Sequence, residues 1–139
     1  MKSTYTALMN SKFFNPAFNS ALFDGPVRIY FAQNQEAMAL KIYFSLQKDF
    51  SDDLQRSKTL YKNRGTNILV MIYPDNEAFC QAFGAKADFM HIERLGSDIV
   101  LGINGPFEDE KLNSVLLRVV ASLQMLNDSQ ESAAEVASL

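Results

Sequence analysis

Short hydrophobic segments alternate along the chain with clusters of polar and turn-forming residues, and their internal spacing is of two kinds. Residues 27–31 are mostly β-branched or aromatic and place apolar side chains at every second position, which predicts a β-strand. Residues 67–73 form a continuous apolar run, as in a strand that is covered on both faces. Residues 87–94 and 98–103 predict two further strands, joined by a segment short enough for a hairpin.

Between these strands the hydrophobic residues recur at helical spacing instead. Residues 35–49 carry a main apolar stripe and, on another side, a second stripe formed by Leu40 and Phe44. Residues 52–62 and 76–83 predict two shorter helices. The last helix begins near residue 108 and has the strongest periodicity of the chain, with apolar residues at Leu112, Val115, Leu116, Val119, Leu123 and Leu126.

The two ends of the chain differ from this central part. The N-terminal segment is rich in aromatic residues, and Asn15-Pro16 is typical of a helix start, so we predict a short helix over residues 17–23. From residue 127 the sequence turns to Ser, Ala, Glu and Gln, which indicates a frayed helix end or a flexible tail. We therefore divide the chain into an aromatic N-terminal extension (1–26), an α/β domain (27–126) and a flexible C-terminal tail (127–139).

The order of the predicted elements defines the fold class. Strand, helix, strand, helix, strand, strand, helix predicts a single α/β domain with a mixed four-stranded sheet, helices on both faces and an N-terminal helical extension. Two strands that flank a helix favour a parallel crossover, whereas the last two strands favour an antiparallel hairpin.

Over residues 27–125 this βαβαββα order resembles the thioredoxin-like core. The resemblance implies a reactive cysteine just after the first strand and a proline before the third, but residues 32–36 contain no cysteine and residues 84–87 no proline. The order also resembles the N-terminal half of zincin-type metallopeptidase domains, whose next helix carries the His-Glu-x-x-His motif. Residues 115–123 contain no such ligands. We therefore expect the chemistry of neither family.

The composition of the chain narrows the classes of protein and of partner that are compatible with this sequence. The chain of 139 residues is 47% hydrophobic and 21% charged, which fits one globular domain. Its net charge is only −3, which gives no electrostatic argument for nucleic acid as a partner. The single cysteine, Cys80, excludes an internal disulfide, which fits a reducing, cytoplasmic setting. No apolar run approaches the roughly 20 residues that span a bilayer, and no secretory signal is recognisable, so no membrane partner is expected.

One group of polar residues is a candidate for a ligand pocket or an active site. His91 is the only histidine, and Glu93 shares its face of the predicted strand, so His91 acting as a general base oriented by Glu93 is one hypothesis. Arg28 and Tyr30 on the first strand complete this candidate pocket. The simpler interpretation, which we favour, is a half-buried structural histidine and a cross-strand ion pair between Arg28 and Glu93.

The other candidates for chemistry are weaker. Cys80 lies among aromatic and small residues; a redox thiol is one hypothesis, and a small buried hydrophobic residue is the interpretation that we favour. A basic cluster consists of Arg56, Lys58, Lys62 and Arg64 with Tyr61, and the dipole of the helix explains most of it. One histidine and one cysteine make no zinc site, and no phosphate-binding or dinucleotide fingerprint is present, so no metal and no cofactor is expected.

Apolar residues outside the main core stripes provide the functional hypothesis. They need a cover, either from another part of the chain or from a partner. We therefore expect a non-catalytic protein-interaction domain that self-associates as a homodimer or binds another protein. The alternative is an enzyme or ligand-binding protein that uses the pocket around His91. The predicted interface residues are Phe13, Phe14, Phe18, Leu40, Phe44, Leu117 and Met125.

Overall fold

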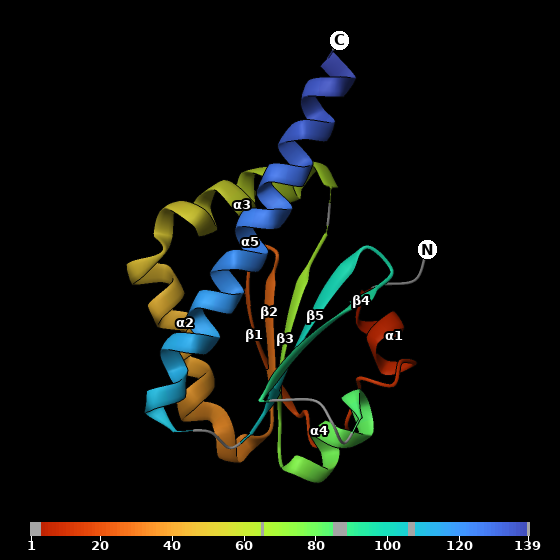
Figure 1. The fold of residues 1–139 in the computed structure, drawn as a ribbon, viewed down its shortest axis with the longest axis vertical. Coiled ribbons are helices and arrows are strands. Elements are labelled where there is room, and N and C mark those ends of the chain that lie inside the picture. The colour runs from red at the N-terminus through yellow and green to blue at the C-terminus, as the bar shows by residue number, and fades with distance from the viewer. Residues whose placement is uncertain (1–3, 65, 85–88, 106–107, 139) are drawn as a thin grey trace.

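The computed structural model describes residues 4–64, 66–84, 89–105 and 108–138 (Figure 1). Its centre is one five-stranded mixed sheet in the order β1-β2-β3-β5-β4. The strands are β1 (Ser20–Asp24), β2 (Val27–Phe31), β3 (Ile68–Tyr73), β4 (Met90–Leu95) and β5 (Asp98–Asn104). The prediction of an α/β domain with a mixed sheet is confirmed.

Parallel strands form the middle of the sheet and antiparallel strands its two edges. β2 pairs in parallel with β3, and β3 in parallel with β5. β1 and β4 pair antiparallel with β2 and β5 respectively. β3 is wholly buried, as its continuous apolar run predicts for a strand between two layers.

Three long helices cover one face of the sheet, as Figure 1 shows. They are α2 (Glu36–Asp49), α3 (Ser51–Arg64) and α5 (Asp109–Ser138). Their apolar stripes pack on alternate residues of the central strands, such as Val70 and Ile72, in the larger hydrophobic cluster of the chain. Ala39, Ile42 and Leu46 of α2 are buried there, which is the stripe that the helical spacing predicts.

The opposite face is covered by α4 (Asn76–Phe83) and by the N-terminal segment, which begins with α1 (Thr4–Met9). The side chain of Asp75 caps α4 by accepting a hydrogen bond from the backbone N–H of Ala78 at 2.8 Å. Leu8, Phe13 and Phe18 are buried against this face of the sheet. The sheet is therefore covered on both faces within one chain.

The N-terminal extension departs from its prediction. Residues 17–23 do not form a helix: Asn15 and Phe18 close a turn, and the chain then enters β1, which adds a fifth strand to the expected four. A two-residue turn joins β1 to β2, and Gly25 adopts φ +58° there. A helix does lie in this segment, but as α1, nearer the N-terminus.

Three further details differ from the predictions. The five-stranded order does not confirm the thioredoxin-like arrangement. Helix α5 continues to Ser138, through residues that the sequence assigned to a frayed or flexible end, and Figure 1 shows this end of the helix extending beyond the sheet. The expected strand over residues 87–94 begins at Met90, and residues 85–88 lie outside the described residues.

Candidate functional site

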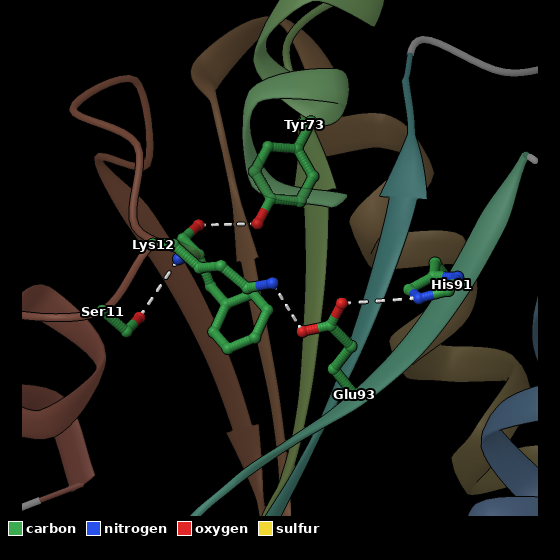
Figure 2. Close-up of polar contacts among 6 residues, drawn as sticks. Ser11, Lys12, Tyr73, His91 and Glu93 are labelled. Atoms are coloured by element: carbon green, nitrogen blue, oxygen red, sulfur yellow. Dashed lines mark hydrogen bonds and ion pairs between the residues drawn. The ribbon is translucent and has the colours of Figure 1, made fainter. Parts of the chain in front are cut away.

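The first candidate site surrounds His91 and Glu93 on the edge strand β4 (Figure 2). The Glu93 carboxylate lies between two basic groups: its Oε2 is 2.8 Å from Lys12 Nζ, and its Oε1 is 3.5 Å from His91 Nε2. The His91 ring also packs edge-on against Phe83, with ring centroids 5.3 Å apart. Lys12 belongs to the N-terminal segment, so this cluster joins that segment to the edge of the sheet.

Two hydroxyl groups lie near this cluster, and both are engaged. Tyr73 Oη donates a hydrogen bond of 2.6 Å to the backbone carbonyl of Phe13. Burial and, to a lesser degree, the negative charge of Glu93 raise the pKa of Tyr73. The Ser11 hydroxyl donates to the carbonyl of Leu8 at 2.7 Å and accepts from the N–H of Phe13 at 3.2 Å. These contacts close the end of α1 and fix Phe13, which is a structural role.

Arg28 and Tyr30 lie elsewhere on the same face of the sheet. They belong to β2, which β3 and β5 separate from β4. Arg28 lies over the ring of Phe23, 5.1 Å from its centroid, and Tyr30 is buried and packs edge-on against Phe23. Neighbouring strands are about 4.8 Å apart, so some 14 Å lies between β2 and β4.

The four residues predicted to line one pocket therefore form two separate pairs. In the strand register, Leu69 and Val100 lie between Arg28 and Glu93, and Met71 and Gly102 lie between Tyr30 and His91. The Arg28–Glu93 cross-strand pair is also absent, because β2 and β4 are not neighbours. His91 is half-buried, and its Nε2 lies 3.5 Å from Glu93 Oε1.

The other residues considered for chemistry, Cys80 and two members of the basic cluster, contact polar or acidic side chains of their own chain. Cys80 is half-buried, not buried as expected, and its thiol lies 3.7 Å from Asn76 Oδ1. Two members of the basic cluster form ion pairs, Arg56 with Asp128 at 3.2 Å and Lys58 with Asp24 at 2.6 Å. The side chains of Tyr61, Lys62 and Arg64 lie outside the described residues.

A buried amide joins the carboxyl ends of the three parallel strands. Gln35, just after β2, donates from Nε2 to the carbonyl of Tyr73 at the end of β3, at 2.7 Å. Gly105, just after β5, packs so closely that an added Cβ would lie 2.2 Å from this nitrogen. Gln35 is 4% exposed, and among the described residues its Oε1 has no hydrogen-bond partner. The amide packs the strand ends together and does not line a described cavity.

Two surface hollows flank the edge strand β1, and no pattern in the sequence predicted either of them. One has a volume of about 220 Å³ and an aromatic lining: Phe18, Asn19, Ser20, Ala21, Phe23 and Tyr30. The other, of about 250 Å³, is polar and is lined by Asp24, Gln47, Ser51, Leu54, Gln55 and Lys58. Within it, Asp24 accepts from Gln47 Nε2 at 2.9 Å and pairs with Lys58.

The predicted interface residues divide into two groups. Phe13 and Phe18 are buried against their own sheet, so the N-terminal segment covers the domain and does not offer these two rings to a partner. Phe14 and Leu40 are half-buried. Phe44, Leu117 and Met125 lie on the outer helical layer and are 57%, 54% and 52% exposed. Phe23 on β1, which the sequence placed in a helix, is 58% exposed.

These observations describe an α/β domain that exposes several large hydrophobic side chains. Comparison with protein-family models, curated proteins and solved structures gave no match to this chain. Among the residues that the structure describes, no group of His, Cys, Asp and Glu has the geometry of a metal site. None of the described helices has the length and apolar character that crossing a membrane requires.

Proposed function

We propose that this chain is a non-catalytic protein-interaction domain that associates with itself. The observation that carries the proposal is the exposure of large hydrophobic side chains. Among the described residues, Met9, Phe23, Phe44, Leu117 and Met125 are 46% to 58% exposed. Single exposed apolar residues are normal on a soluble protein, but these include two aromatic rings and two residues eight positions apart on helix α5.

The contacts of the candidate polar residues support the same proposal. Glu93 contacts both His91 and Lys12. Its ion pair with Lys12 links the N-terminal segment to β4. A general base would need a substrate-sized cleft and a reacting group beside it. The polar hollow beside Asp24 offers a neutralised ion pair instead. The single cysteine suits a reducing compartment, so we place this domain in the cytoplasm, with a second copy or another protein as its partner.

Static light scattering on the purified chain tests this proposal. The measurement should run from about 1 to about 100 µM, where weak protein dimers dissociate and form. We expect the mass to rise toward twice the 15.6 kDa of one chain. A monomer mass across the whole range would contradict self-association.

A further inference from the structure

The two edges of the sheet are protected to different degrees. The edge strand β4 carries His91, Glu93 and Arg94, and charged residues discourage pairing with another strand. β1 (Ser20–Asp24) contains no lysine, arginine or proline, and it pairs with β2 over five consecutive residues without a bulge. In the described structure no strand pairs with its outer side. β1 therefore presents an unblocked edge of main-chain hydrogen-bonding groups.

The side chains of β1 alternate between a small and a large residue on the aromatic-hollow face. Ala21 is opposite Tyr30 and Phe23 is opposite Arg28 in the pairing with β2, so both point to the face that bears Tyr30. Ala21 is exposed and forms part of the lining of the 220 Å³ hollow. Phe23 stands at its rim with the highest exposure of the large hydrophobic residues described. The face thus has an exposed ring and, two residues away, a recess with aromatic walls.

We propose that β1 pairs antiparallel with β1 of a second copy, about a twofold axis that passes by Leu22. This inference rests on the self-association proposed above and names the surface that makes it. In that register Leu22 of one copy lies opposite Leu22 of the other. Phe23 of the second copy lies directly opposite Ala21 of the first. Residues directly opposite in an antiparallel pair lie on the same face, about 5 Å apart at Cβ. Each Phe23 ring therefore enters the other copy's hollow, and the two sheets become one.

The charges of the edge agree with this register. Asp24 is the only ionisable residue of β1, and the twofold places it opposite Ser20, not opposite a second carboxylate. Asp24 is also paired with Lys58 of its own chain at 2.6 Å, so its charge is balanced before two copies meet. The two Phe23 rings are diagonal neighbours, about 7–8 Å apart between strands and within reach of each other. An isologous contact of this kind closes on itself and forms a dimer without further growth.

The exposed residues of the helical layer are the competing surface for a second copy. Phe44, Leu117 and Met125 lie on helices whose main-chain hydrogen bonds are already made within each helix. A partner there gains side-chain contacts alone, whereas β1 also offers main-chain groups. The matched variants Phe23→Lys and Phe44→Lys separate the two surfaces, because each places one lysine at a position that is more than half exposed.

The dissociation constant of each full-length variant, from sedimentation velocity, is the readout. We expect Phe23→Lys to weaken dimerisation at least about tenfold, as for the loss of a central aromatic contact. Phe44→Lys should leave the constant within about threefold of the parent value, as for residues outside the interface. The reverse pattern would overturn the β1 interface and leave self-association standing. A parent chain that is monomeric throughout would remove both proposals. Ala21→Lys repeats the test at an exposed position if Phe23→Lys fails to fold.

A swap of the two residues tests the register itself. Ala21→Phe alone sets two rings opposite each other, and Phe23→Ala alone leaves the hollow empty, so each should weaken association. In the double variant a ring again faces an alanine across the twofold, and the dimer should return. A folded double variant that is no tighter than either single variant would overturn the register centred on Leu22.

Discussion

Tyr73 links the N-terminal segment to the middle of the sheet through one short hydrogen bond. Its hydroxyl donates to the carbonyl of Phe13, and its ring packs against Phe18, Phe79 and Phe83. Burial disfavours the phenolate and raises the pKa of Tyr73, and the Glu93 carboxylate adds to the effect. The neutral phenol is therefore part of the folded structure.

This raised pKa predicts a loss of stability at alkaline pH. The unfolded chain releases the Tyr73 proton above a pH of about 10, whereas the folded chain retains it. The unfolded state then binds fewer protons, so the free energy of unfolding falls as pH rises above that value, by up to about 1.4 kcal/mol per unit. Urea unfolding between neutral pH and pH of about 11 measures the slope. Tyr73→Phe should reduce it; an unchanged slope in that variant would assign the effect to other groups.

Gly102 shows a second constraint at the scale of one residue. A Cβ at this position would lie 2.0 Å from Cε2 of Phe83, whose ring is held between Phe13, Tyr73, Phe79 and His91. The missing side chain at this position therefore leaves room for the Phe83 ring.

Gly102→Ala should therefore displace the Phe83 ring and lower the free energy of unfolding by about 1–3 kcal/mol, the usual cost of overpacking. Chemical denaturation of the variant measures this loss. In a Phe83→Ala background the same glycine substitution should cost much less, because the obstructing ring is gone. Equal losses in both backgrounds would show that Phe83 is not the cause.

Among elements, the central strands and the helices were predictable, and the N-terminal segment was not. β2 and β3 are rich in β-branched residues, and α5 has a long apolar period, so local pattern and final environment agree. In residues 17–23 the Asn-Pro pair and the small residues favoured a helix, but pairing with β2 decides their conformation. Gly25-Pro26 directly before the alternating strand residues 27–31 was the available signal, since a glycine at the first central position is typical of a two-residue hairpin turn.

The candidate site was predictable only residue by residue. The contact between His91 and Glu93 follows from strand alternation. Its distance from Arg28 and Tyr30 depends on which strands are neighbours, and no local pattern encodes that order. The partner of Glu93, Lys12, comes from a segment 81 positions earlier in the chain (93 − 12), so its approach required the full fold.

The N-terminal segment should behave as part of the core and not as an appendage. Phe13 is 3% exposed and packs on Phe83, with ring centroids 5.5 Å apart. Phe13→Ala should lower the free energy of unfolding by about 3–5 kcal/mol, as for other buried phenylalanines.

Phe14→Ala is the matched control for this element, since Phe14 is half-buried and contacts Phe18 at 6.5 Å between centroids. It should cost clearly less than Phe13→Ala in the same urea titration. Equal, small losses for both variants would mean that the segment contributes little to the stability of the domain.

At the scale of the whole molecule, both faces of the sheet are covered by other elements, whereas its edge strand β1 has an unblocked outer side. Three helices cover one face, and α4 with the N-terminal segment covers the other. The charged strand β4 limits one end of the sheet, and the uncharged residues 20–23 of β1 lie at the other. The added strand that the sequence did not predict is thus the one that we assign to self-association.

Amide hydrogen exchange along the full-length chain tests this assignment most directly. It should be measured at concentrations well below and well above the dissociation constant of the dimer. Pairing of β1 with its copy predicts that amides within Ser20–Asp24 gain protection as the dimer forms. Unchanged exchange in β1 while the mass doubles, with new protection in α2 or α5 instead, would contradict the account.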